Sequence, residues 1–127
     1  MTDILFVDRL EQTDSVLSEV MYERVRQISK GYDAAHDDSS ETGGQARAAA
    51  YYATAAYFQR KWYENNCIDL TPDELADIEW QAREDSVGYP WYIGTRKVSA
   101  TARKNLIKAA ALIVAEIERI DREERAQ

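Results

Sequence analysis

Cysteine, histidine and proline are nearly missing from this chain of 127 residues, which has one cysteine, one histidine and two prolines. Cys67 alone cannot form an internal disulfide or a cysteine-based zinc site. His36 alone excludes two-histidine zinc sites and the phosphohydrolases that need several histidines. The sequence also lacks a Walker-type Gly-rich loop and a serine in a Gly-rich elbow. We therefore expect a protein without a resident metal or other cofactor.

Long apolar runs and a surplus of positive charge are missing as well. No stretch approaches the roughly 18 apolar residues of a membrane span, and the segment after Asp3 lacks the basic region of a signal peptide. The net charge of −7 argues against general nucleic-acid binding, because phosphate backbones require a basic surface. We expect a cytoplasmic protein without a membrane partner, built as one helical domain over residues 1–127.

Apolar residues recur at helical spacing in four segments, which predicts an all-α fold. The first helix is expected from about Asp14 to Lys30, with Gly31 just after its end. The second follows a polar loop over residues 37–44 and reaches about Asn65. Small side chains along one face of this second helix predict close helix packing, and they are Ala46, Ala49, Ala50, Ala53 and Ala56.

The third helix has the clearest start signal of the four. Thr71-Pro72-Asp73-Glu74 is typical of a capping box, and the helix should run to about Ser86. Leu75, Ile78 and Ala82 line its apolar face. Ile4-Leu5-Phe6-Val7 is too short to assign to a strand or to a helical turn. The sequence therefore leaves open a short β-hairpin between residues 4–7 and 91–98.

The fourth helix is expected after Ser99 and reaches about Glu124. Its apolar residues alternate at four- and three-residue steps, a narrow seam typical of coiled coils, and they are Leu106, Ala110, Ile113, Ile117 and Ile120. Such a helix is about 38 Å long, whereas a globule of this size is about 36 Å across. The long C-terminal helix therefore predicts a homo-oligomer, either a dimer or a larger assembly.

Positive charge collects where acids are missing. No acidic residue lies between Asp85 and Glu116, whereas five cations do, namely Arg96, Lys97, Arg103, Lys104 and Lys108. This window spans the expected start of the fourth helix, where free amides and the helix dipole favour an anion. One interpretation is that the cations pair with the acid-rich third helix. The other is a phosphorylated ligand, with Trp91 and Tyr92 stacking on its base.

A second group of polar residues surrounds the end of the first helix. It consists of Glu23, Arg24, Arg26, Tyr32, His36, Asp37 and Asp38. Arginines beside a histidine and two carboxylates have the composition of an active site. They also have the composition of an ordinary surface held by weak ion pairs. The sequence leaves catalysis, binding and structure open for this group.

Carboxylate spacing bears on one enzyme class, the helical nucleotide pyrophosphohydrolases of the MazG type. These bind magnesium through Glu-x-x-Glu and Glu-x-x-Asp pairs on neighbouring helices, because magnesium takes hard oxygen ligands in octahedral geometry. Residues 45–63 contain no acid at all. Glu118 and Asp121 are three apart, but the spacing of Glu118 and Arg122 is that of a surface ion pair. The pattern predicts no metal site of this class.

Several motifs together resemble a family of small phage and prophage proteins. They are Glu23-Arg24-x-Arg26-Gln27, Gly31-Tyr32-x-x-x-His36-Asp37-Asp38, Tyr89-Pro90-Trp91, and the run from Lys108 to Arg119 that reads KAAALIVAEIER. The chain is also loosely similar to Thoeris anti-defence sponges, oligomeric phage proteins that trap cyclic ADP-ribose-type signals. That resemblance implies Arg24 and Arg103 as phosphate contacts and Trp91 as a base-stacking wall. Residues 68–86 look like an insertion, which puts the shape of such a pocket in doubt.

These observations favour a phage-type accessory protein that sequesters a nucleotide-derived ligand without turnover. The residues expected to bind it are Arg24, Arg26, Trp91, Tyr92, Arg96, Lys97, Arg103 and Lys104. One alternative is a metal-dependent nucleoside triphosphate pyrophosphohydrolase that uses His36, Asp37, Asp38 and Glu23. The other is an acidic protein that inhibits a host defence complex.

Overall fold

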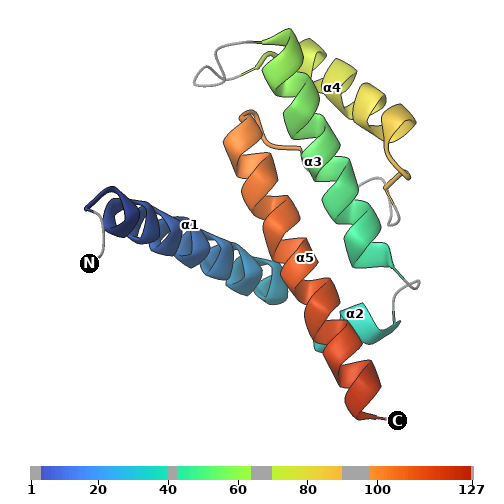
Figure 1. The fold of residues 1–127 in the computed structure, drawn as a ribbon. Helices are drawn as coiled ribbons and strands as arrows, with labels where there is room; N and C mark the ends of the chain where they lie inside the picture. The colour runs from blue at the N-terminus through green and yellow to red at the C-terminus, as the bar shows by residue number, and fades with distance from the viewer. Residues whose placement is uncertain (1–3, 40–42, 64–69, 90–97, 127) are drawn as a thin grey trace.

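The computed structural model describes residues 4–39, 43–63, 70–89 and 98–126, with side chains from Leu10 onward, and all regular structure in these ranges is helical. The helices are α1 (Ile4–Ser29), α2 (Ala34–Ser39), α3 (Gly44–Trp62), α4 (Pro72–Asp85) and α5 (Ala102–Arg125) (Figure 1). The all-α prediction is confirmed, and α4 and α5 begin and end close to the predicted residues.

The N-terminal third differs from the prediction in two ways. Residues 4–7 lie within α1, so the hairpin between residues 4–7 and 91–98 is wrong, and residues 90–97 lie outside the described ranges. The helix begins ten residues before Asp14 because Leu10 continues the helical spacing of Leu17 and Met21. A further helix, α2, was not predicted and overlaps the first residues of the predicted polar loop. Its first turn is capped by Asp33, with its carboxylate 3.0 Å from the amide of His36.

Local end signals fix the other boundaries. After α1, the amide of Tyr32 donates to the carbonyl of Gln27, and the amide of Gly31 donates to that of Ile28. This Schellman motif requires the left-handed φ of 104° at Gly31, as the sequence predicted. At α4 the Thr71 hydroxyl accepts from the Glu74 amide, while the Glu74 carboxylate accepts from the Thr71 amide, which confirms the capping box.

The core lies around α3, which packs between α4 and α5 (Figure 1). Its buried members are mostly alanines and aromatics of α3, together with Ile78 and Ala82 of α4 and Ala109 and Leu112 of α5. The small-residue face of α3 is shifted from the prediction, since Ala46 is exposed and Ala48 and Ala55 are fully buried. The shift arises because α3 has neighbours on two sides and buries Tyr51 and Phe58 as well.

Helix α1 crosses α5 and projects away from α3 and α4 (Figure 1). Only Val20, Arg24 and Gln27 of its described side chains are buried. The seam predicted on α5 faces outward, with Leu106, Ile113, Ile117 and Ile120 all exposed. None of the described helices is long and apolar enough to cross a membrane.

Candidate functional site

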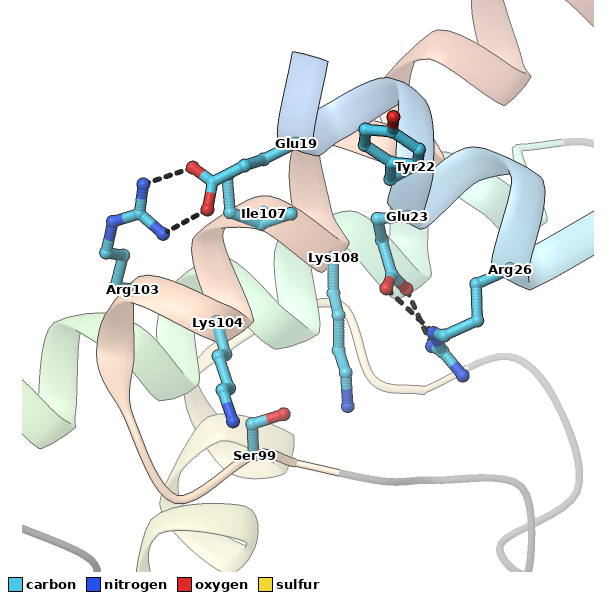
Figure 2. A pocket seen from close by; sticks show the side chains of 9 residues that line it. All are labelled: Glu19, Tyr22, Glu23, Arg26, Ser99, Arg103, Lys104, Ile107 and Lys108. Atoms are coloured by element: carbon cyan, nitrogen blue, oxygen red, sulfur yellow. Dashed lines mark hydrogen bonds and ion pairs between the residues drawn. The ribbon is translucent and has the colours of Figure 1, made fainter. Parts of the chain in front are cut away.

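A pocket of about 510 Å³ lies between the second half of α1 and the first two turns of α5 (Figure 2). Side chains of α1 form one wall, and Ser99 with the start of α5 forms the other. The lining residues are Glu19, Tyr22, Glu23, Arg26, Ser99, Arg103, Lys104, Ile107 and Lys108. The pocket therefore occupies the place where the sequence predicts an anion.

Basic groups outnumber acidic ones in this pocket, four to two, in a chain whose net charge is −7. The two carboxylates each engage one arginine. Glu19 accepts from both terminal nitrogens of Arg103, with 3.0 Å between Nη1 and Oε1. Glu23 accepts from Nε and Nη2 of Arg26 at 2.8 and 2.6 Å. The lining therefore holds two more basic than acidic groups.

Lys104 and Lys108 extend in the same direction from α5, and the Arg26 guanidinium approaches them from α1 (Figure 2). Lys104 makes no ion pair with any carboxylate in the described part of the chain. The Nζ atom of Lys108 lies 5.4 Å from the centre of the buried Tyr52 ring, a cation–π contact that fixes its direction. The positive end of the α5 dipole adds to this local charge, because Thr101 caps the helix beside Lys104.

The Arg103 hydrogen bonds lower the pKa of the Glu19 carboxyl below its ordinary value of 4.5. The same contact raises the pKa of Arg103. Glu19 is therefore ionised at neutral pH and lies where an oxygen of a bound anion would otherwise face Arg103. A bidentate guanidinium–carboxylate pair has the same fork geometry as a guanidinium–phosphate pair.

A buried network of amides positions the floor of the pocket. Asn105 and Gln59 are fully buried, and Asn105 Nδ2 donates to Gln59 Oε1 over 2.7 Å. Asn105 Oδ1 accepts from the Ser99 amide at 2.8 Å, while Gln59 Nε2 donates to the Ser99 carbonyl at 2.9 Å. Ser99 and the start of α5 are thus fastened to α3 at a defined position.

The second polar group forms a separate cluster between α1, α2, α3 and α5. Asp37 is 1% exposed, and its carboxylate accepts from Arg24 at 3.2 Å and from Gln45 at 3.0 Å. His36 Nδ1 lies 3.0 Å from Asp37 Oδ1, the oxygen that also accepts from Gln45. Arg24 also donates to the Tyr32 carbonyl at 2.9 Å and to Glu118 at 3.1 Å. The buried Asp37 carboxylate is thus contacted from three sides, by Arg24, Gln45 and His36.

Asp38 points away from this cluster and pairs with Arg122 at 2.8 Å on the surface. The hydrogen bond from Arg122 lowers the pKa of the Asp38 carboxyl. The spacing of Glu118 and Arg122 predicted a pair between them, but Glu118 binds Arg24 and Arg122 binds Asp38. Helix α1 provides Arg24 as the partner of Glu118, and α2, whose presence was not predicted, provides Asp38 as the partner of Arg122.

The structure therefore divides the residues predicted to bind a ligand. Arg26, Arg103 and Lys104 line the pocket, and Glu23 joins them from the second polar group. Arg24 is buried beside Asp37 and does not line the pocket. Arg103 pairs with Glu19 of α1, not with the acid-rich α4. The remaining predicted residues, Trp91, Tyr92, Arg96 and Lys97, lie outside the described ranges.

Sequence reasoning missed Glu19 and Tyr22 as parts of the pocket. A usable signal was present, because residues 19, 22, 23 and 26 share one face of a helix at three- and four-residue spacing. What the sequence could not give is the contact between Glu19 and Arg103, which are 84 residues apart.

Within the described ranges, no three histidine, cysteine, aspartate or glutamate side chains gather in a way that could hold a metal ion. Known proteins offer no parallel for the pocket, because no family model, curated protein or solved structure matches the chain. The case for function rests on the pocket's own chemistry.

Proposed function

We propose that this protein binds a phosphorylated, nucleotide-like small molecule in the pocket between α1 and α5 and sequesters it without turnover. The observation that carries the proposal is the excess of basic groups around a pocket in an acidic chain. Lys104, Lys108 and Arg26 converge on one side of it, and Arg103 closes one end (Figure 2).

The size of the pocket suits this class of ligand. Its volume of about 510 Å³ falls within the roughly 300–1,000 Å³ of small-molecule sites. Lysine ammonium groups bind phosphate as point charges, and arginine binds two phosphate oxygens at once. Tyr22 lies at the edge of the pocket and is 77% exposed, so its ring is accessible for stacking on a base.

Glu19 acts in this proposal as an internal competitor for Arg103. A nucleotide with two phosphate groups carries more negative charge in total than a single carboxylate, and each phosphate offers the same paired oxygens. We expect the ligand to displace the Glu19 carboxylate from Arg103 and to place its own oxygens there. The arrangement explains why a half-exposed arginine in a pocket holds an acidic partner before a ligand arrives.

Binding without turnover is supported by the state of the pocket carboxylates. A general base needs a pKa near the working pH, whereas the Arg103 hydrogen bonds lower the pKa of Glu19. Glu23 accepts from both Arg26 and Gln27, so its oxygens already have donors. Neither carboxylate is arranged to activate water.

The biological setting we propose follows from the resemblance of the motifs to phage proteins. The protein would act in the cytoplasm, that of the host if it is viral, as an anti-defence accessory protein. Its ligand would be a nucleotide-derived immune signal, such as a cyclic ADP-ribose isomer or a cyclic nucleotide. We also propose that it works as a homo-oligomer.

The test is a calorimetric titration of the purified protein with cyclic ADP-ribose isomers, cyclic dinucleotides and inorganic phosphate. We expect Lys104→Ala to weaken binding of the preferred ligand by about tenfold to a hundredfold, because a charged hydrogen bond is lost. Heating the complex should release the ligand chemically intact, which separates sequestration from hydrolysis.

Lys30→Ala is the matched control, because Lys30 is an exposed lysine that does not line the pocket. It removes the same charge and should leave affinity nearly unchanged. The proposal is abandoned if none of the ligands binds, or if Lys104→Ala and Lys30→Ala weaken binding equally. Recovery of cleaved products after heating would support the pyrophosphohydrolase alternative instead.

A second candidate function is inhibition of a host defence complex through an acidic surface. Helix α4 supports it, because Asp73, Asp77, Glu84 and Asp85 are all exposed there. This candidate predicts that the protein captures one stable host partner in a pull-down, and that charge reversal on α4 abolishes capture. Lys104→Ala would leave the capture intact.

A further inference from the structure

The largest aliphatic side chains of this protein lie on the outside of two helices. On α5 the seam is uncovered, and its members Leu106, Ile113, Ile117 and Ile120 are 51%, 50%, 54% and 40% exposed. On α1 a second stripe is uncovered, comprising Leu10, Leu17, Met21, Val25 and Ile28. The buried positions of α5 are instead occupied by four alanines, Asn105 and Leu112.

The position of the seam on α5 shows which neighbours leave it free. At 100° per residue, the seam is turned well over 90° from the buried face that carries Asn105, Leu112 and Ala115. That buried face packs on α3, and α1 packs along a third side near Arg103 and Ile107. The seam therefore faces away from α3.

We infer that the α5 seam is the interface for a second copy of this chain, with the two α5 helices paired antiparallel about a two-fold axis near Ile113. This inference does not depend on the proposed ligand. A heptad-spaced seam of leucine and isoleucine takes another helix as its partner through knobs-into-holes packing. A chain that carries an uncovered seam of this kind can pair it with the same seam of a copy.

Charge along α5 determines the direction of the pairing. At 100° per residue, Arg103 lies beside the N-terminal end of the seam, whereas Asp121 and Glu124 lie beside its C-terminal end. Parallel pairing would set like charges side by side at both ends. Antiparallel pairing about Ile113 instead brings Arg103 of each copy beside Glu123 and Glu124 of the other, and it opposes the two helix dipoles.

The uncovered area agrees with a dimer. The exposed parts of the α1 stripe and the α5 seam together present on the order of 1,000 Å² of apolar surface. Monomers rarely expose apolar patches of more than a few hundred Å², and one partner of a stable complex typically contributes about 800 Å².

The exposed N-terminal half of α1 is a further reason to expect a partner there. Every described side chain from Leu10 to Glu19 is exposed, although Glu19 pairs with Arg103 of α5. A helix of that length is marginal in water without tertiary contacts. A second copy supplies the surface that the single chain lacks.

Oligomeric state in solution tests the interface. Light scattering after gel filtration should give twice the 14.5 kDa mass of one chain. Ile113→Lys places two ammonium groups against each other at the two-fold axis and should weaken association by about a hundredfold or more. Because Ile113 is half exposed in the single chain, the Ile113→Lys variant should keep its helical circular dichroism signal. The control is Trp80→Lys, an equally exposed apolar side chain on α4, which should remain dimeric.

Disulfide cross-linking in a Cys67→Ser background tests whether the two α5 helices run antiparallel. Mixing the Leu106→Cys and Ile120→Cys variants should give a disulfide between different chains, whereas either variant alone should give little. Efficient self-linking of Leu106→Cys would show parallel pairing and overturn the arrangement. A monomer at 100 µM, or a dimer that Ile113→Lys leaves intact, would overturn the interface itself and would indicate another occupant for the seam.

Discussion

Replacing Asp37 by alanine separates a structural role of the Arg24–Asp37 cluster from a catalytic one. Asp37 is 1% exposed, and the Arg24 side chain beside it is 11% exposed, so the substitution leaves a guanidinium in the interior with one carboxylate fewer. Removing one partner of a buried ion pair typically costs about 3–5 kcal/mol of unfolding free energy. Glu118 still faces Arg24 from a half-exposed position, so we expect the low end, about 3 kcal/mol.

Urea denaturation followed by circular dichroism measures this cost. With a slope near 1.5 kcal/mol per molar, a loss of about 3 kcal/mol moves the midpoint down by about 2 M. All variants must be compared at one protein concentration, because association adds to apparent stability. The double variant Arg24→Met with Asp37→Leu should lose less unfolding free energy than the single Asp37→Ala variant, because the double variant removes both charges of the pair together.

Asp38→Ala is the matched control for this experiment. It removes the neighbouring carboxylate, whose pair with Arg122 lies on the surface and therefore contributes little to stability. The structural reasoning is refuted if Asp37→Ala and Asp38→Ala shift the midpoint equally. If Asp37→Ala leaves stability unchanged and abolishes a magnesium-dependent nucleotide hydrolysis, the cluster has the catalytic role of the pyrophosphohydrolase alternative and not a structural one.

Three further substitutions or conditions have expected outcomes. Thr71→Ala should lower the unfolding free energy by about 1 kcal/mol, seen as a lower urea midpoint, because the hydroxyl that accepts from the Glu74 amide is lost. The Asp38–Arg122 pair holds the pKa of Asp38 below its ordinary value of 3.8, so its contribution is complete above that pH and is lost as pH falls through the lowered value. Asp38→Asn should remove that part of the acid sensitivity in thermal melts between pH 5 and 2. Asn105→Ala should cost about 3 kcal/mol and should also weaken phosphate binding in calorimetry, because Ser99 loses its anchor.

The parts of the fold that the sequence predicted are those determined by local chemistry. Thr71 and Glu74 form their capping box within four residues, and Gly31 ends α1 through its own backbone conformation. These signals involve no distant partner, so the residues alone are enough. The start of α1 was misplaced because Asp14 and Ser15 have the composition of a helix cap, yet both lie inside the helix. Side-chain preference for a cap does not prevent a helix from continuing when the preceding residues also favour it.

The candidate site could be predicted in part for a similar reason. The window without acids is visible along the chain, so Arg103 and Lys104 were placed correctly at the start of α5. Arg24 and Arg26 lie about 200° apart on a helix, so only one of them can face the interior. The sequence does not say which, because the choice is made by Asp37, which comes from α2 and is itself buried.

The seam on α5 shows why periodicity predicts a contact better than it predicts the partner. The spacing of Leu106, Ile113 and Ile117 identifies a surface that must be covered, but covering it within one chain would require a further helix on that side. The chain instead packs α5 through alanines, which bring backbones close and contribute little transfer free energy. If the large aliphatic side chains are buried only on association, much of the stability belongs to the assembly. The unfolding midpoint should then rise with protein concentration, and Ile113→Lys should remove that dependence.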